Sequence, residues 1–207
     1  GDPQASLGSY RRAHALDPEN IDAINFIGQL EHLFGNLKAA DDAFRQVLDV
    51  GRTQDDKEAI AAAYGNLGVI AMTRGDLDTA VDYYNQALAL NKKLGRKEGM
   101  ALSYAMLGHV AVARGDLLEA RQFLVQARGL FAAQSFERIA ALVKRGVAAT
   151  AQQEQAQAAL DTAKAGVVAA EADLARAKDA ASYSALTAPM DGVVTATLVD
   201  PGTVVSV

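Results

Sequence analysis

The chain of 207 residues contains no cysteine. This absence excludes disulfide bonds, thiolate metal sites and cysteine nucleophiles together. A surplus of basic charge is also missing, because 20 lysine and arginine side chains stand against 25 aspartate and glutamate side chains. A nucleic-acid-binding surface usually requires a basic excess, so nucleic acid is not an expected partner. No apolar run reaches the roughly 18 residues of a membrane-spanning helix, and no transmembrane segment is expected.

A secretory signal peptide is absent as well. The first residues, GDPQASLGSY, resemble the middle of a structural unit, so the sequence is expected to be a fragment. The missing signal peptide therefore leaves the compartment open. Half of the residues are apolar, which is enough for a sizeable core in one or two domains.

Recognisable catalytic sets are also lacking. No carboxylate pair, Ser-His-Asp set or phosphate-binding loop stands out, so the chain is not expected to be an enzyme or to need a cofactor. The three histidines, His14, His32 and His109, lie far apart in the sequence. A metal site needs convergent ligands, so these histidines are interpreted as surface or groove residues.

What the chain does contain is a repeat with a step of 40 residues. Five columns keep their register across three copies, which is very improbable by chance. The columns are Ile27-Gly28, Leu67-Gly68 and Leu107-Gly108; Gly35, Gly75 and Gly115; Ala40, Ala80 and Ala120; Phe44, Tyr84 and Leu124; and Val47, Ala87 and Ala127.

Each copy of this repeat predicts a helical hairpin. An apolar stripe at helical spacing ends at a glycine of the second column, as is common at the C-terminal cap of a helix. The segments GDLDTA and GDLLEA then begin the next helix, with Asp76 and Asp116 as the expected N-caps. One hairpin cannot cover its own apolar face, so neighbouring hairpins are expected to stack into a solenoid.

At these residues the chain resembles the tetratricopeptide repeat (TPR). The pattern of that family is an aromatic residue, two further residues and Leu-Gly, followed by Ala-x-x-x-Phe on the second helix. Tyr64 before Leu67-Gly68 and Tyr104 before Leu107-Gly108 match this pattern, and the 40-residue step resembles the long-repeat subgroup. The resemblance covers residues 1–131, with a partial repeat at 1–20 and repeats at about 21–52, 56–92 and 96–131.

The resemblance implies a non-catalytic interaction scaffold whose concave groove, lined by the first helix of each hairpin, binds a peptide or protein segment. The groove positions of the family correspond to Asn25, Gln29, Asn66, Val69, Met72, Leu102, Met106 and His109. Lysine and arginine are absent there, which argues against the carboxylate-clamping mode of one subgroup. Asn66 stands where long-repeat relatives hydrogen-bond the backbone of an extended peptide. A solvated or helix-bonded asparagine is the alternative interpretation.

Beyond about residue 131 the repeat columns stop and the composition shifts to alanine. Apolar residues then recur at alternating steps of four and three, which predicts a narrow coiled-coil seam and a closely packed partner helix. The alternative, a helix that caps the solenoid, calls for a broader apolar stripe. The seam residues are Ala156, Leu160, Ala163, Val167, Ala170, Leu174, Ala177 and Ala181.

Residues 133–207 show a second resemblance, to the periplasmic adaptor (membrane fusion, HlyD-like) proteins of tripartite efflux pumps. It rests on the alanine heptads followed by YSALTAPMDGVVTATLVDPGTVV. The resemblance implies an adaptor hairpin-like helical segment at 132–182 and half of a lipoyl-like domain at 183–207. No lysine lies between Tyr183 and Val207, so lipoylation is not expected. The expected terminal strands are 184–187, 192–198 and 203–207.

In this second interpretation Arg138, Leu142 and Thr150 correspond to the hairpin tip that docks onto an outer-membrane channel, although Ala149 stands where serine is expected. The chain would then belong to an efflux or secretion system in the periplasm or cell envelope, with pump or channel subunits as partners. Otherwise a cytoplasmic location is expected, and a fusion of the two kinds of protein remains a third alternative. The expected fold class is mainly α: a TPR helical-hairpin solenoid, a long alanine-rich coiled-coil-type helix and a short terminal β-meander.

Overall fold

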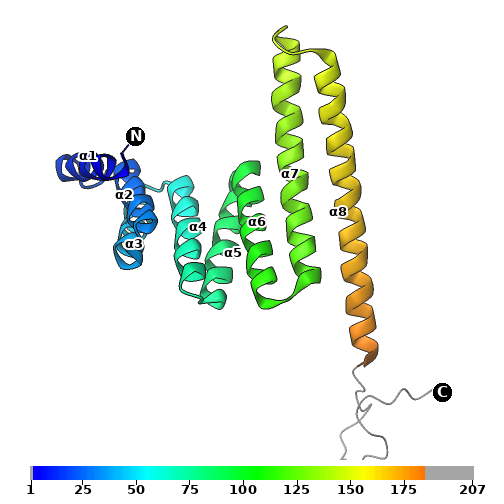
Figure 1. Cartoon of the computed structure of the whole chain (residues 1–207), viewed down its shortest axis with the longest axis horizontal. Coiled ribbons are helices and arrows are strands. Elements are labelled where there is room, and N and C mark those ends of the chain that lie inside the picture. The colour runs from blue at the N-terminus through cyan, green and yellow to red at the C-terminus, as the bar shows by residue number, and fades with distance from the viewer. Residues whose placement is uncertain (1, 185–207) are drawn as a thin grey trace, which may run out of the picture. The chain divides into compact units, whose positions relative to one another are not determined.

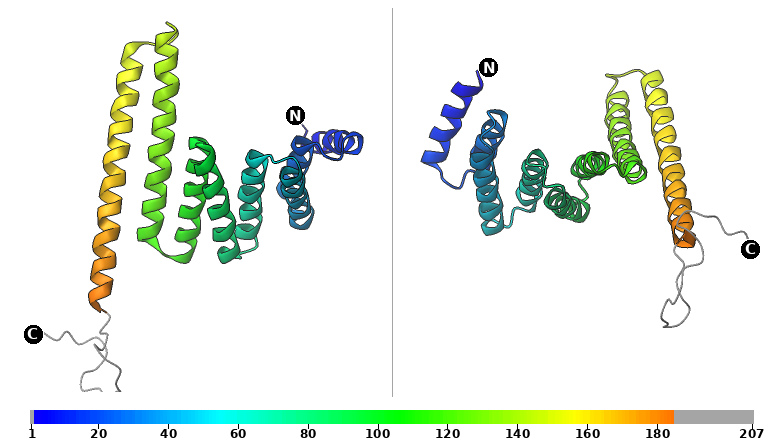
Figure 2. Two further views of the ribbon diagram at one scale, coloured as in Figure 1. Left: turned by 180° about the vertical axis from the view of Figure 1, so that it is seen from behind. Right: turned by 60° about the horizontal axis from the view of Figure 1, so that its bottom comes forward.

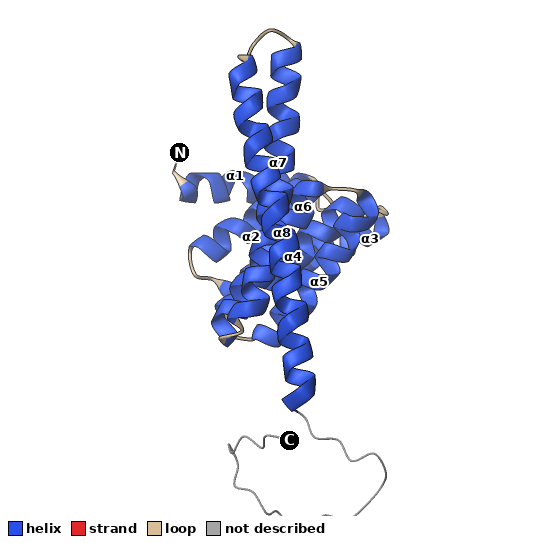
Figure 3. Ribbon diagram, turned by 90° about the vertical axis from the view of Figure 1, so that its right-hand side faces the viewer, coloured by secondary structure: helices blue, strands red, loops and turns tan. Residues whose placement is uncertain are grey.

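The computed structural model describes residues 2–184, and all regular structure within them is α-helical (Figures 1 and 3). The helices are α1 (Pro3–Leu16), α2 (Ile21–Leu33), α3 (Leu37–Thr53), α4 (Lys57–Thr73), α5 (Leu77–Leu94), α6 (Lys97–Arg114), α7 (Leu117–Lys144) and α8 (Thr150–Ser184). Apart from Ser184, the last residue of α8, the expected terminal strands fall outside the described residues. Among residues 2–184 no helix is long and apolar enough to cross a membrane.

Helices α2 and α3, α4 and α5, and α6 and α7 form three antiparallel hairpins joined by short turns (Figures 1 and 2). Each hairpin also packs against the next, through α3 and α4 and then through α5 and α6. Further contacts join α2 to α4 and α4 to α6, so the first helices of the hairpins lie next to one another. The predicted TPR-like solenoid of stacked helical hairpins is therefore confirmed.

The helix ends lie where the repeat columns predict them. The column glycines Gly35, Gly75 and Gly115 have φ angles of 79°, 78° and 84°, a left-handed conformation that lets the chain leave each first helix. Asp76 caps α5 by accepting a hydrogen bond from the Thr79 backbone N–H at 3.2 Å. Asp116 occupies the N-cap position of α7 but makes no side-chain capping bond.

The core is built from the remaining columns. A Cβ atom added to Gly28 would lie 2.7 Å from Phe44, and one added to Gly68 would lie 2.5 Å from Tyr84. Each ring thus occupies the space that a glycine leaves on the facing helix, and both rings are buried. Leu124 lies against Gly108 in the same way, but it is 36% exposed.

The second helix of the third hairpin continues past the repeat. Because α7 runs unbroken from Leu117 to Lys144, the expected boundary at residue 131 falls inside a helix. Helix α8 returns beside it, and Gln126 on α7 donates a hydrogen bond to Glu171 on α8 at 2.8 Å. Val167 lies beside Gly129, and Arg121 forms an ion pair with Asp173. The partner helix that the heptad seam requires is therefore α7.

The seam of α8 follows the predicted heptad as far as Leu174. Ala156, Leu160, Ala163 and Ala170 are buried, and Val167 and Leu174 are partly buried. Residues 1–174 form one compact unit, and residues 175–207 form a second unit of which only the end of α8 is described. Within that second unit Ala177 is partly buried and Ala181 is exposed.

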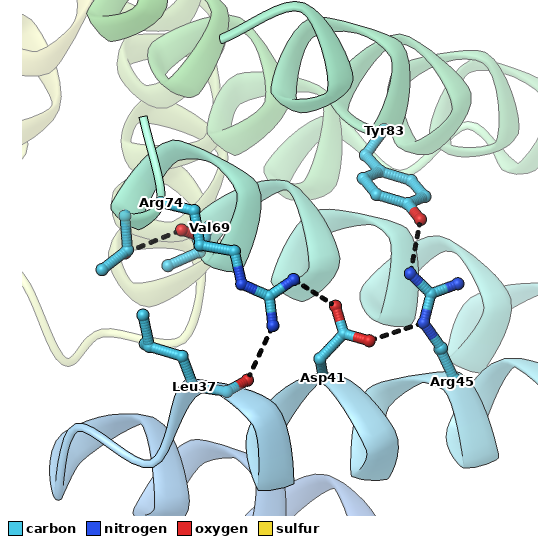
Figure 4. A network of polar contacts seen from close by, with 7 residues as sticks. Leu37, Asp41, Arg45, Val69, Arg74 and Tyr83 are labelled. Carbon is cyan, nitrogen blue, oxygen red and sulfur yellow. Dashed lines mark hydrogen bonds and ion pairs between the residues drawn. The ribbon is translucent and has the colours of Figure 1, made fainter. Parts of the chain in front are cut away.

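A network of charged side chains joins the first two hairpins (Figure 4). Asp41 on α3 accepts hydrogen bonds from Arg45 at 2.6 Å and from Arg74, at the end of α4, at 3.1 Å. Arg74 also donates to the Leu37 carbonyl at 3.3 Å, and Arg45 donates to the Tyr83 hydroxyl on α5 at 3.3 Å. Asp41 is the centre of the network, and its side chain is only 13% exposed.

Replacing Asp41 with alanine is expected to lower the free energy of unfolding by about 1–2 kcal/mol, because two charge-assisted hydrogen bonds are lost while both arginines can turn to water. The bond from Arg74 joins the two hairpins, and the bond from Arg45 lies within α3. Asp42→Ala on the same helix is the matched control, since Asp42 is exposed. Urea denaturation of both variants measures the difference. Equal midpoints for the two variants would show that the network contributes nothing to the packing of the hairpins.

Candidate functional site

A groove with a volume of about 440 Å³ opens between α2, α4, α5 and α6. Six of the eight groove residues predicted from the sequence line it: Asn25, Gln29, Asn66, Val69, Leu102 and Met106. The other two do not. Met72 packs against a core cluster that includes Ala71 and Leu107, and His109 is exposed on α6. The structure therefore brings together residues from all three first helices.

Asn25 and Asn66 meet where α2 and α4 approach each other. The Asn66 Nδ2 group donates a hydrogen bond to Asn25 Oδ1 at 2.9 Å. Within residues 2–184 the Oδ1 atom of Asn66 and the Nδ2 group of Asn25 have no hydrogen-bond partner, so one acceptor and one donor remain for a ligand. The sequence did not predict this pair, because Asn25 and Asn66 are 41 residues apart and fall in different columns of the repeat.

The base of the groove is formed by Tyr84 and Asn91 on α5 and by Ser103 on α6, which together we call the polar floor. All three side chains are buried. Asn91 Nδ2 donates to the Ala87 carbonyl at 2.9 Å, and Ser103 Oγ donates to the Gly99 carbonyl at 2.8 Å. Tyr84 and Asn91 lie on a second helix, whereas the TPR resemblance implies a groove lined by the first helices, so these two residues were not predicted from the sequence.

Tyr84 is the least satisfied member of the polar floor. Its side chain is 1% exposed, and its hydroxyl has no hydrogen-bond partner among the described residues. Burial raises the pKa of Tyr84 to about 12, because the phenolate would be shielded from water. The group is therefore a neutral hydroxyl at physiological pH, able to donate one hydrogen bond.

Small residues give the groove its depth. A Cβ atom added to Gly99 would lie 2.1 Å from Asn91 Oδ1, so the asparagine occupies space that only a glycine leaves. One 40-residue step earlier, the same two positions hold Gly51 and Ala59. Asn91 and Gly99 thus stand where the preceding copy has Gly51 and Ala59, so the larger side chain is at the other position of the pair. This difference between copies is the sequence signal that could have identified Asn91.

The charges at the edge of the groove are largely paired. Arg96, which lines it, forms an ion pair with Glu58 at 3.1 Å, and both side chains are exposed to solvent. Glu98 is the other charged residue lining the groove. The interior consists of alanine, glycine, apolar and uncharged polar side chains, so it favours a ligand segment without net charge.

The remaining predicted residues lie elsewhere. Arg138 and Thr150 are exposed and Leu142 is half-buried, and all three lie near the turn between α7 and α8. His14 has a buried Nδ1 atom without a hydrogen-bond partner among residues 2–184, whereas His32 Nε2 lies 3.3 Å from the Thr73 hydroxyl. No group of three or more potential metal ligands gathers within the described part of the chain.

Solved structures of several proteins have similar folds. MamA is 19% identical, with a TM-score of 0.50, over 85% of this chain and 92% of its own. BtubC (BKLC) from P. vanneervenii is 18% identical, with a TM-score of 0.52, over 96% of this chain and 95% of its own. A putative kinesin light chain from Podosopora anserina, with nearly identical TPR-like repeats, is 17% identical, with a TM-score of 0.51, over 79% of this chain and 86% of its own. Identities this low show the fold alone.

No curated protein sequence matches the chain. The sequence model of the MalT-like TPR region matches residues 16–192. This match includes the helical segment that resembles an adaptor hairpin, and none of the comparisons supports the adaptor resemblance. The chain belongs to the family of MalT-like TPR regions.

Proposed function

We propose that this chain is a non-catalytic scaffold for protein–protein interaction, and that the groove between α2, α4, α5 and α6 binds an extended peptide segment of a partner protein. TPR-like folds are typical of such scaffolds. The observation that carries the proposal is the Asn25–Asn66 pair, which leaves an acceptor and a donor free beside the groove. An extended peptide backbone presents the complementary N–H and C=O groups at regular spacing.

Apolar side chains of α4 and α6 add area for binding in the same groove. Val69 lies one helical turn from Asn66 on α4, and Leu102 and Met106 lie one turn apart on α6. Leu102 is 50% exposed, so part of its side chain is available to a ligand. Backbone hydrogen bonds combined with apolar contacts would bind a short segment without requiring charge on the peptide.

Two groove substitutions test this function. Peptides selected from a phage-displayed random 12-residue library on the wild-type protein are expected to bind Asn66→Ala about 5–10-fold more weakly, because a hydrogen bond is worth about 1 kcal/mol. Met106→Glu is expected to weaken them by more than about tenfold, since it places a charge beside apolar surface. Isothermal titration calorimetry measures both affinities.

His109→Ala is the matched control, because His109 lies on α6 outside the groove and is exposed. Circular dichroism shows whether each variant keeps its helices. If Asn66→Ala and Met106→Glu bind the selected peptides as tightly as His109→Ala does, the groove is not the binding surface.

A second candidate function is an adaptor component of an efflux or secretion system. The feature that motivates it is the helix pair α7 and α8, because the adaptor resemblance implies a helical hairpin with Arg138, Leu142 and Thr150 toward its tip. This function predicts pump or channel subunits as partners of the hairpin turn. A photo-crosslinker at Thr150 that captures only ligands of the groove would count against it.

A further inference from the structure

The polar floor interrupts an otherwise apolar pattern in the repeat. Tyr84, Asn91 and Ser103 stand one 40-residue step after Phe44, Gly51 and Ala63. One step later the same columns hold Leu124, Phe131 and Val143. Both neighbouring copies are thus free of polar side chains at all three positions, and the one copy that carries them lines the groove.

Packing alone does not require the Tyr84 hydroxyl. Phe44 lies against Gly28 as Tyr84 lies against Gly68, and both rings are buried. The ring alone therefore completes the contact between helices. Buried hydroxyls almost always have a hydrogen-bond partner, yet that of Tyr84 has none within residues 2–184. Tyr84 lines the groove, so a ligand bound there can supply the missing acceptor.

The other two members of the polar floor can supply acceptors. Asn91 uses its Nδ2 group on the Ala87 carbonyl, which leaves its Oδ1 atom as an acceptor. Ser103 gives its proton to the Gly99 carbonyl, so its oxygen can still accept. The polar floor therefore combines two donors, the Tyr84 hydroxyl and the second N–H of Asn91, with two acceptors, the complement of a group that both accepts and donates.

We propose that the polar floor is a selectivity pocket that accepts a primary amide side chain, glutamine or asparagine, from the bound peptide, with Tyr84 donating to the amide oxygen. This inference rests on the proposed peptide-binding function. A carboxylate has no donor to offer the two acceptors and would lose its hydration at a buried site. Arg96, a cation that lines the groove, already pairs with Glu58. Ala61, Gly65 and Ala87 line the groove with small side chains, which leaves room for the stem of the amide.

The test uses the tightest peptide selected from the random 12-residue library on the full chain. Selected peptides are expected to share glutamine or asparagine at one position, and replacing that residue with glutamate or methionine should weaken binding at least tenfold. Tyr84→Phe removes one hydroxyl and keeps the ring. It is expected to weaken the amide-bearing peptide about tenfold and to remove its advantage over the methionine-substituted peptide, while the thermal midpoint stays the same or rises.

Tyr83→Phe is the matched control on the same helix, because Tyr83 hydrogen-bonds Arg45 outside the groove. It should leave the affinity unchanged. The inference is overturned if the selected peptides share no amide position, or if Tyr84→Phe alters only the thermal midpoint. In those cases the groove function still stands when Asn66→Ala and Met106→Glu reduce binding. If every peptide selected on the wild type also binds Met106→Glu, both the groove function and the selectivity pocket are refuted.

Discussion

A single methyl group added at Gly68 is expected to destabilise the solenoid by about 1–3 kcal/mol, because it overpacks a filled interface. The new Cβ atom would lie 2.5 Å from Tyr84 Cε1, well inside van der Waals contact. Tyr84 is 1% exposed and is packed among its neighbours, so its ring can yield little. The conflict must instead separate α4 from α5, which form one hairpin of the repeat.

Gly65 provides a control within the same helix. No heavy atom lies within 4 Å of a Cβ added there, so Gly65→Ala meets no steric conflict. Alanine is preferred over glycine in a helix by about 0.8–1 kcal/mol, so this variant should be more stable than the wild type. Urea denaturation gives both changes in the free energy of unfolding. Equal effects of Gly65→Ala and Gly68→Ala would refute the close packing of Tyr84 on Gly68.

The difference between these two glycines was visible in the sequence. Gly68 recurs as Gly28 and Gly108 at the repeat step, whereas Gly65 has no counterpart at either position. A repeated glycine marks a place where two helices approach closely in every copy. The same logic predicted the stacked hairpins and the left-handed glycines, because each depends on contacts that the repeat reproduces.

Features found in one copy were harder to predict. The Asn25–Asn66 hydrogen bond joins two different columns, and the unpaired Tyr84 hydroxyl depends on the burial of its surroundings. A repeat pattern describes what the copies share. It therefore predicts the scaffold, but it does not identify residues that occur in only one copy. The polar floor lies in the one copy that departs from its neighbours at these positions.

The α7–α8 hairpin shows a second limit of sequence patterns. The heptads of α8 predicted a narrow buried seam, and Ala156, Leu160 and Ala163 are buried as expected. Periodicity reports which face of a helix is covered, but it does not identify the covering helix. Because the repeat columns end before residue 131, the continuation of α7 to Lys144 had no signal in the repeat.

Glutamate at Ala163 is expected to unfold α8 locally while leaving the repeats intact. Ala163 is 1% exposed in the seam, so the substitution buries an uncompensated charge at a cost on the order of 3–5 kcal/mol. Alanines supply most of the buried seam, and their small side chains bury little apolar area against this penalty. Hydrogen exchange should therefore show α8 losing protection while α2–α6 retain theirs.

Ala159→Glu is the matched control, because Ala159 lies on the exposed face of the same helix. It adds the same charge and nearly the same helix propensity, so protection of α8 should remain at the wild-type level. Any loss specific to Ala163→Glu then reports the buried seam alone. Equal protection in the two variants would mean that α8 does not pack on α7 through this face, and the seam would have to be covered by another surface. Retained protection of α2–α6 in Ala163→Glu would also show that the structure of the groove does not depend on the packing of α8. Peptide binding by this variant would then show that the groove functions without α8.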